Sequence, residues 1–204
     1  MSCILLSRRR WLALSLAGLV VPGAATRAAK AEGAEAVIDR LTRKAVRILA
    51  TTEVGSPQRK AGLRSLLEEG FDLPYLAQLA VGRAWRKLSA AERQDFIRIF
   101  TRWVLETQSA RLSQYAGEEI VVTGSRPVGE GDTMVATRIQ GGKLEQPIEV
   151  DWRVRERGGD DRIIDVVIEG VSMVVTYRNE FQAIVERGGV EALKAELAAR
   201  AGKS

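Results

Sequence analysis

The sequence contains no histidine, and its only cysteine is Cys3. The absence of histidine excludes Ser-His catalytic triads and removes the commonest general base and most zinc sites. Cys3 precedes the first apolar run, so a chain cleaved after that run would have no thiol for a disulfide or for nucleophilic catalysis. No glycine-rich phosphate-binding loop is present, so we do not expect this chain to use ATP. We expect neither an enzyme nor a protein with a cofactor or a bound metal.

An excess of basic residues is confined to the first part of the chain. The 204 residues carry a formal net charge of +5. Residues 1–29 contain four arginines and no acid, which leaves 27 basic residues against 26 acidic ones in the remainder. This balance gives no support for nucleic acid as a partner.

Residues 1–29 have the pattern of a cleavable export signal. Three arginines, Arg8 to Arg10, precede an uncharged apolar run of eleven residues, Trp11–Val21. Such a run suits a signal sequence and is short for a transmembrane helix. Ser7–Leu12 also fits a twin-arginine signal, so the export route is either Sec or twin-arginine. An uncleaved amphipathic anchor is the alternative, and residues 30–204 are expected to form one domain. The candidate cleavage sites follow Ala25, Ala29 and Ala31.

The first half of the mature chain has the 3.6-residue period of helices. Ser56-Pro57 and Asp72 are typical helix starts, and Ser89 with Glu92 forms a capping box. The expected helices cover residues 32–52, 57–69, 73–82 and 90–115.

The period then changes to that of strands. Pro147–Arg155 alternates apolar and charged residues, and Gly158–Asp161 is a typical hairpin turn. After Gly170 the helical period returns with Ser172 as N-cap, breaks at Gly188-Gly189, and resumes for residues 190–201. We expect an α+β fold, with an antiparallel twisted sheet of about four strands packed against several helices. The expected strands are Ile120–Thr123, Thr133–Gln140, Pro147–Arg155 and Arg162–Glu169.

Four segments together resemble the MlaC family, whose members are also described as toluene-tolerance or ABC-transporter auxiliary proteins. They are Phe71–Phe96, Arg111–Val122, Pro147–Arg155 and Ile163–Phe181. The resemblance covers nearly the whole mature chain, and the order and spacing of the segments carry it. One departure is Asp161-Arg162, where relatives often have an aromatic residue before the last strand.

The resemblance implies a soluble periplasmic lipid carrier with an apolar pocket between its helices and sheet. Its ligand would be a phospholipid. Its partners would be an inner-membrane MCE-protein/ABC-transporter complex and an outer-membrane lipoprotein complex. A carrier of the hopanoid-associated branch of the family is a second hypothesis. An adaptor with a solid core is a third, and a small hydrolase or isomerase that uses Asp165 is a fourth.

The resemblance also turns the apolar faces into candidate pocket walls, although each residue equally suits an ordinary core. Arg83 and Arg178 could approach a lipid phosphate, because guanidinium matches phosphate geometry. A solvated or salt-bridged surface arginine is the alternative for both. The candidate lipid-binding residues are Phe96, Phe100, Trp103, Val104, Val150, Trp152, Val154, Ile164, Val166, Ile168, Val174, Tyr177 and Phe181.

Overall fold

A computed structural model describes residues 33–115, 117–129, 131–156 and 159–203. The expected export signal at residues 1–29 lies outside these ranges. The helices are α1 (Ala34–Thr51), α2 (Pro57–Gly70), α3 (Leu73–Val81), the 3-10 helix η1 (Gly82–Lys87), α4 (Ala90–Leu112) and α5 (Met173–Ala201). The strands are β1 (Glu118–Pro127), β2 (Asp132–Gly141), β3 (Ile148–Arg155), β4 (Arg162–Ile168) and β5 (Val171–Ser172).

The five strands form one antiparallel sheet in the order β1-β2-β3-β4-β5. Its two faces differ as strand alternation requires. Thr137 pairs with Val150, and both are buried, whereas the adjacent pair Arg138 and Glu149 is exposed and joined by an ion pair of 2.7 Å. One face therefore meets the helices and the other meets solvent, as the sequence predicts.

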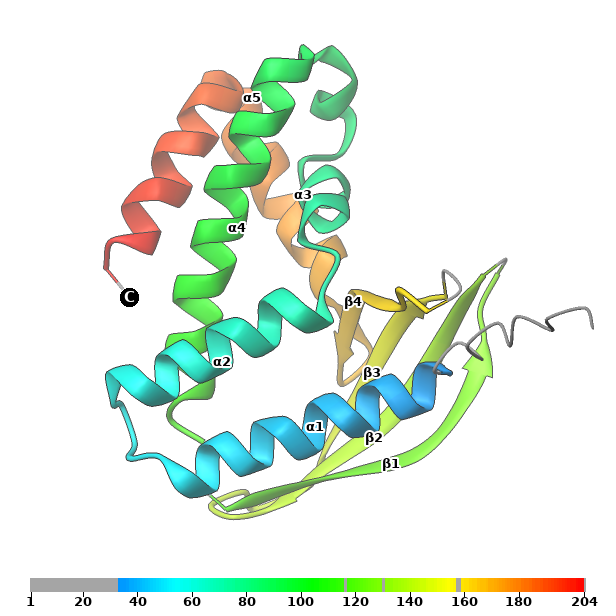
Figure 1. The fold of residues 1–204 in the computed structure, drawn as a ribbon. Helices are drawn as coiled ribbons and strands as arrows, with labels where there is room; N and C mark the ends of the chain where they lie inside the picture. The colour runs from blue at the N-terminus through cyan, green and yellow to red at the C-terminus, as the bar shows by residue number, and fades with distance from the viewer. Residues whose placement is uncertain (1–32, 116, 130, 157–158, 204) are drawn as a thin grey trace, which may run out of the picture.

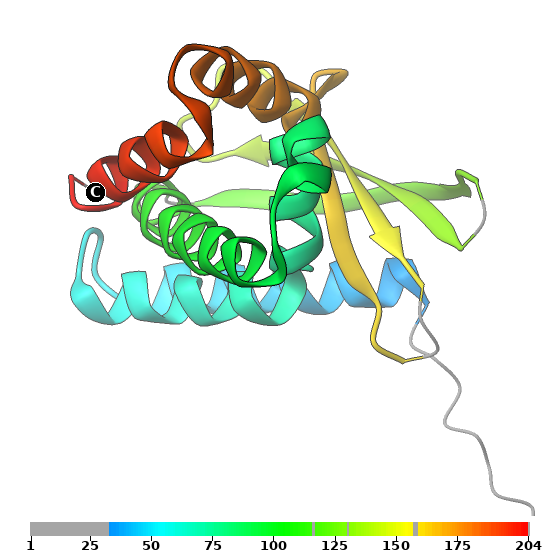
Figure 2. The same cartoon turned by 90° about the horizontal axis from the view of Figure 1, so that it is seen from above.

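Helix α1 lies along the inner face of the sheet, while α3, α4 and α5 form a second body above it (Figure 1). Helix α2 contacts both α1 and α4 and so connects the two parts. Seen from above, α5 changes direction halfway along its length (Figure 2). The change falls at Gly189, whose φ of 73° departs from helical geometry. Glycine tolerates this conformation at no steric cost, which explains why the helical pattern breaks there.

The helix starts that the sequence predicts are confirmed. The backbone N–H of Arg59 donates to the Ser56 hydroxyl at 3.2 Å, and that of Tyr75 donates to the Asp72 carboxylate at 3.0 Å. Ser89 and Glu92 form the reciprocal capping box. These caps satisfy backbone donors that have no partner within the helix, and so they set where α2, α3 and α4 begin.

Three features differ from the expected elements. Strand β1 runs for ten residues instead of four, because the pairing continues past a register shift between Val122 and Gly124. A bulge of this kind interrupts apolar alternation while it lets the strand bend, so the sequence pattern ends early. The two-residue strand β5 and the 3-10 helix η1 are too short to show a period.

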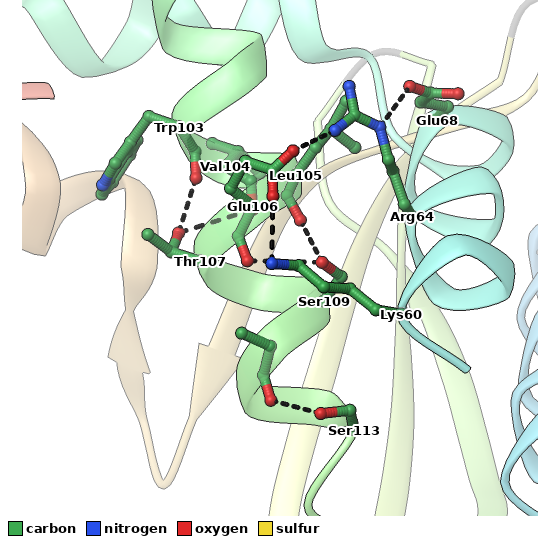
Figure 3. A network of polar contacts seen from close by, with 11 residues as sticks. Lys60, Arg64, Glu68, Trp103, Val104, Leu105, Glu106, Thr107, Ser109 and Ser113 are labelled. Carbon is green, nitrogen blue, oxygen red and sulfur yellow. Dashed lines mark hydrogen bonds and ion pairs between the residues drawn. The ribbon is translucent and has the colours of Figure 1, made fainter. Parts of the chain in front are cut away.

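Helices α2 and α4 are joined by a polar network on their shared side (Figure 3). The Glu106 carboxylate on α4 pairs with Arg64 and, at 3.1 Å, with Lys60, both on α2. Hydrogen bonding from Lys60 is the largest of the effects that hold the pKa of Glu106 below its usual value; the charges of both cations lower it further. The Ser109 hydroxyl is fully buried and donates to the Leu105 carbonyl at 2.5 Å, which satisfies this donor on the packed side of α4.

Candidate functional site

An apolar cavity of about 330 Å³ lies between the sheet and the helices. Helices α1, α2, α3, α4 and α5 and strands β1 to β4 all contribute to its wall. The helical part of the lining includes Ile38, Leu41, Leu49, Leu63, Leu66, Leu67, Leu76, Ala80, Phe100 and Val104. The sheet part includes Ile120, Ile139, Val150, Trp152, Ile163, Val166 and Ile168. A concave, mostly apolar space with few polar groups is the usual form of a small-molecule site.

The cavity opens at one end of the sheet. Of the lining residues, Val46, Arg111 and Ile168 are exposed, and every other lining residue is buried or half-buried. Val46 lies on α1 and Arg111 in the last turn of α4, while Ile168 ends β4. Strand register places the start of β1, the end of β2 and the start of β3 at this same end. We call this end of the cavity, formed by Val46, Arg111, Ile168 and these strand ends, the mouth.

Eight of the predicted binding residues line the cavity: Phe100, Val104, Val150, Trp152, Val166, Ile168, Val174 and Tyr177. Five do not line it: Phe96, Trp103, Val154, Ile164 and Phe181. All five are buried. The sequence pattern therefore indicated correctly that they are buried, but not whether they face the cavity or the solid core. Whether the eight contact lipid stays a prediction.

The five residues that do not line the cavity pack into solid core. Phe96, Trp103 and Phe181 belong to the cluster between α3, α4 and α5. Val154 belongs to the cluster between α1, α2 and the sheet. Ile164 is 1% exposed and stands at the register shift between β3 and β4. Trp103 packs against the cavity-lining residue Tyr177 from the core side, with ring centroids 5.0 Å apart.

Sequence reasoning missed the wall that α1 and α2 supply. Ile38, Leu41, Leu63, Leu66 and Leu67 line the cavity and are almost completely buried. Their periodic spacing in α1 signalled burial, yet periodicity alone cannot tell a residue that faces a void from one that faces a neighbour.

Polar groups are few along the wall and gather toward the mouth. Tyr177 accepts a hydrogen bond from the Gln108 side chain at 3.3 Å. Burial raises the pKa of the Tyr177 hydroxyl, and the positive charge of nearby Arg111 opposes the rise. Arg83 and Arg178 lie elsewhere, in a separate open hollow between η1 and α5. Arg178 donates to the Leu79 carbonyl at 2.9 Å, and neither arginine lines the apolar cavity.

The comparisons with known proteins agree on one family. Residues 35–199 match the family model described as MlaC protein. The chain belongs to the MlaC family. The resemblance on which the sequence prediction relied is therefore confirmed over nearly the whole described chain.

A curated relative and a solved structure are similar to this chain. The intermembrane phospholipid transport system binding protein MlaC of Haemophilus influenzae is 22% identical over 125 residues. That match covers 60% of this chain and 58% of the relative, which is less than two thirds of its length. A solved phospholipid-binding protein from Ralstonia solanacearum, in complex with a phospholipid, superposes with a TM-score of 0.68 at 21% identity. The superposition covers 86% of this chain and 98% of the other, and it confirms the predicted α+β fold.

Asp165 has a structural position in this MlaC-family chain. Its carboxylate accepts hydrogen bonds from the Ser172 hydroxyl at 2.6 Å and from the backbone N–H groups of Val166 and Val174 at 2.8 and 3.1 Å. These contacts place negative charge at the start of α5, where the helix dipole favours it. The carboxylate thus anchors α5 to β4, and the hydrolase hypothesis stays a prediction.

Arg59 on α2 joins the ends of α1 and α4. Its side chain is 3% exposed and forms no ion pair with a carboxylate of the described residues. Instead it donates to the carbonyls of Leu49 in the last turn of α1 and of Thr52 just after it, and to those of Ser113 and Tyr115 after α4. Carbonyl groups at helix ends lack partners and carry partial negative charge, so one cation satisfies two helix ends together.

The described residues offer neither a metal site nor a membrane-spanning helix. No group of three or more His, Cys, Asp or Glu side chains in that part of the molecule could hold a metal ion. None of the helices found there is long and apolar enough to cross a bilayer.

Proposed function

We propose that this protein is a lipid carrier that holds the acyl part of a phospholipid in the apolar cavity. The observation that carries the proposal is a cavity whose wall is apolar along its depth and opens at one end, in a member of the MlaC family. The Haemophilus relative is named for phospholipid transport between membranes, and the Ralstonia structure contains a phospholipid. Both descriptions support the same class of ligand for this chain.

The energetics of acyl chains suit a carrier. About 30 methylenes transferred from water at roughly 0.8 kcal/mol each give about 24 kcal/mol. This sum exceeds the roughly 20 kcal/mol at which non-covalent affinity saturates, so it overstates real binding. A lipid that comes from one bilayer and enters another moves between apolar phases instead. The cavity then needs only to hold the acyl chains about as favourably as a bilayer does, and the partners determine the direction of transfer.

The location and the partners belong to the same proposal. Residues 1–29 would direct export to the periplasm by the Sec or the twin-arginine route. There the carrier would exchange lipid with an inner-membrane MCE-protein/ABC-transporter complex and an outer-membrane lipoprotein complex. The apolar surface, and not a catalytic group, would be the functional part of the molecule.

Native mass spectrometry of the mature protein, purified from periplasm and followed by lipid extraction, tests the proposal. We expect the protein mass plus that of a stoichiometric phospholipid, and the mass difference reports the headgroup and the number of chains. A bound hopanoid would move the protein to the hopanoid-associated branch. An apo mass that is unchanged after incubation with phospholipid vesicles would contradict the carrier and favour the adaptor. The mass of the secreted chain also reports whether residues 1–29 are removed.

A further inference from the structure

The open hollow between η1 and α5 carries an excess of positive charge. Its wall comes from the end of α3, from η1 and from part of α5, and its volume is about 910 Å³. Among the described residues that line it, Glu186 is the one acid. The cations that line it are Arg83, Arg86, Lys87 and Arg178. We call this site the basic hollow.

The three cations of η1 have no partner among the residues that the structure describes. Arg83, Arg86 and Lys87 are exposed, and none of them forms an ion pair or a side-chain hydrogen bond within that part of the chain. Elsewhere the fold matches cations with acids, as in the pair of Lys194 and Asp95 at 2.8 Å. The positive charge of η1 is therefore available to a group from another molecule.

Backbone geometry holds the start of η1 beside α5. Gly82 has a φ of 62°, a conformation that residues with a side chain rarely adopt. A Cβ atom at this position would lie 3.4 Å from Cγ of Arg178, so glycine also suits the close approach of η1 to α5. Arg178 donates to the Leu79 carbonyl on α3 at 2.9 Å. The three elements of the wall are thus joined before any partner binds, which lowers the cost of binding.

The other end of η1 is held by a contact with α4. Arg93 donates to the Trp85 carbonyl at 3.2 Å, and its guanidinium lies over the indole ring, 5.4 Å from the centroid. In a 3-10 helix, side chains three residues apart eclipse each other, so Arg83 and Arg86 lie on one face of η1. Their guanidinium groups offer planar sets of donors that match carboxylates.

The η1 wall of the basic hollow and the mouth lie at opposite ends of α4. Helix α4 leads from the top of the helical body down toward the sheet (Figure 1). It starts just after η1, whereas Arg111 of the mouth lies in its last turn. At about 1.5 Å per residue, its 23 residues span roughly 35 Å. A partner bound at η1 would therefore leave the mouth open for lipid.

We propose that the basic hollow is a docking surface for an acidic segment of a partner protein, rich in aspartate and glutamate. The carboxylates of the segment pair with Arg83, Arg86 and Lys87, and the segment lies in the concave surface between η1 and α5. A flat anionic bilayer fits this surface less well, because the hollow is concave and its η1 wall lies far from the mouth. The inference goes beyond the proposed function and does not depend on what the cavity holds.

The test is the binding of a fluorescein-labelled poly-glutamate peptide to the protein purified from periplasm, followed by fluorescence anisotropy. The hollow variant carries Arg83→Gln, Arg86→Gln and Lys87→Gln together. We expect the natural chain to bind the peptide and the hollow variant to bind it about tenfold more weakly, the combined scale of three exposed ion pairs. Binding by the natural chain should also weaken as salt rises past about 0.15 M, because salt screens exposed charges.

A control variant removes the same amount of charge elsewhere. It carries Arg47→Gln, Arg102→Gln and Lys143→Gln, at three exposed cations that line neither the basic hollow nor the apolar cavity. This variant should bind the peptide as the natural chain does. Because all the substituted side chains are exposed, both variants should keep the stability of the natural chain closely, and urea denaturation verifies this.

The outcomes separate this inference from the proposed function. The docking surface is wrong if the natural chain does not bind the peptide, or if the hollow and control variants lose binding equally. If the natural chain instead floats with phosphatidylglycerol vesicles and the hollow variant does not, the surface meets a membrane, which also overturns the inference. Native mass spectrometry of the same samples reports the lipid load, which neither variant should change. Peptide binding by a chain that never takes up lipid would overturn only the carrier function.

Discussion

The indole ring of Trp103 meets the phenol ring of Tyr177 edge to face, with centroids 5.0 Å apart. Trp103 is 3% exposed and faces the solid core, whereas Tyr177 faces the cavity. Edge-to-face pairs add stability beyond the area they bury. Trp103 on α4 thus supports Tyr177 in the part of the cavity wall that α5 supplies.

Removal of this contact should destabilise the fold. We expect Trp103→Ala to lower the free energy of unfolding by about 3–5 kcal/mol, the usual cost of a buried aromatic side chain. Urea denaturation with linear extrapolation measures the change. Trp85→Ala, at a half-buried tryptophan outside the cavity, should cost less. A loss below about 1 kcal/mol for Trp103→Ala would show that the cluster repacks around the gap.

A charge on the cavity wall should abolish lipid uptake. Val166 lines the cavity, while its neighbour Val167 points to the other face of the sheet and pairs with Asp151 and Ser172. We expect Val166→Glu to lose bound lipid, because a carboxylate among acyl chains has no partner. Val167→Glu should keep it. Native mass spectrometry reports both, and retention of a full lipid load by a folded Val166→Glu would contradict the assignment of this wall.

The buried guanidinium of Arg59 should be among the costliest polar groups to remove. Arg59→Met keeps the apolar stem but leaves the carbonyls of Leu49, Thr52, Ser113 and Tyr115 without this donor. We expect a loss of about 2–4 kcal/mol, since orphaned buried acceptors keep their desolvation cost. Arg47→Met, at an exposed arginine of α1, should change stability by less than about 0.5 kcal/mol. Urea denaturation measures both variants, and equal losses of unfolding free energy would contradict this role of Arg59.

Asp132 should make stability depend on pH in acid. Its carboxylate is 4% exposed and accepts from Arg153 and Arg155 at 2.8–3.1 Å. Burial pushes the pKa of Asp132 up, but the hydrogen bonds and charges of Arg155 and Arg153 outweigh it and hold the pKa below its usual value of 3.8.

The sign follows from proton linkage. A carboxyl group whose pKa is lower in the folded state stabilises the fold above its unfolded pKa, and this stability fades as pH falls through the folded pKa. We therefore expect Asp132→Asn to cost about 1–3 kcal/mol at neutral pH. The gap to the natural chain should close below the ordinary value of 3.8. Urea denaturation at neutral pH and at successively lower pH measures it, and a gap that stays constant into strong acid would rule out the ion pair as its source.

Local signals carried most of the fold prediction. The Ser89–Glu92 capping box and the Ser56 and Asp72 caps bond backbone groups within four residues, so the sequence pattern already contains the interaction. Strand β1 was harder, because the register shift near Gly124 depends on pairing with β2. Its full length is set by pairing with β2, which the pattern of one strand alone does not contain.

The cavity depends on distances that no pattern contains. Trp103 and Val104 are adjacent apolar residues of one helix, yet Val104 lines the cavity and Trp103 packs away from it. A small difference in the rotation of α4 decides between the two. Arg59 was missed because its partners are backbone carbonyls, which every residue has. No sequence pattern marks Glu118, and only the fold shows that one of its oxygens is buried.

The exposed lining residues gather at one end of the cavity in the described chain. For a carrier, as proposed, this means that lipid enters and leaves through the same opening, the mouth. A donor and an acceptor then compete for one position on the surface and must take turns. Lipid transfer by such a molecule is sequential, so its overall rate is limited by the rate at which the carrier dissociates from each partner.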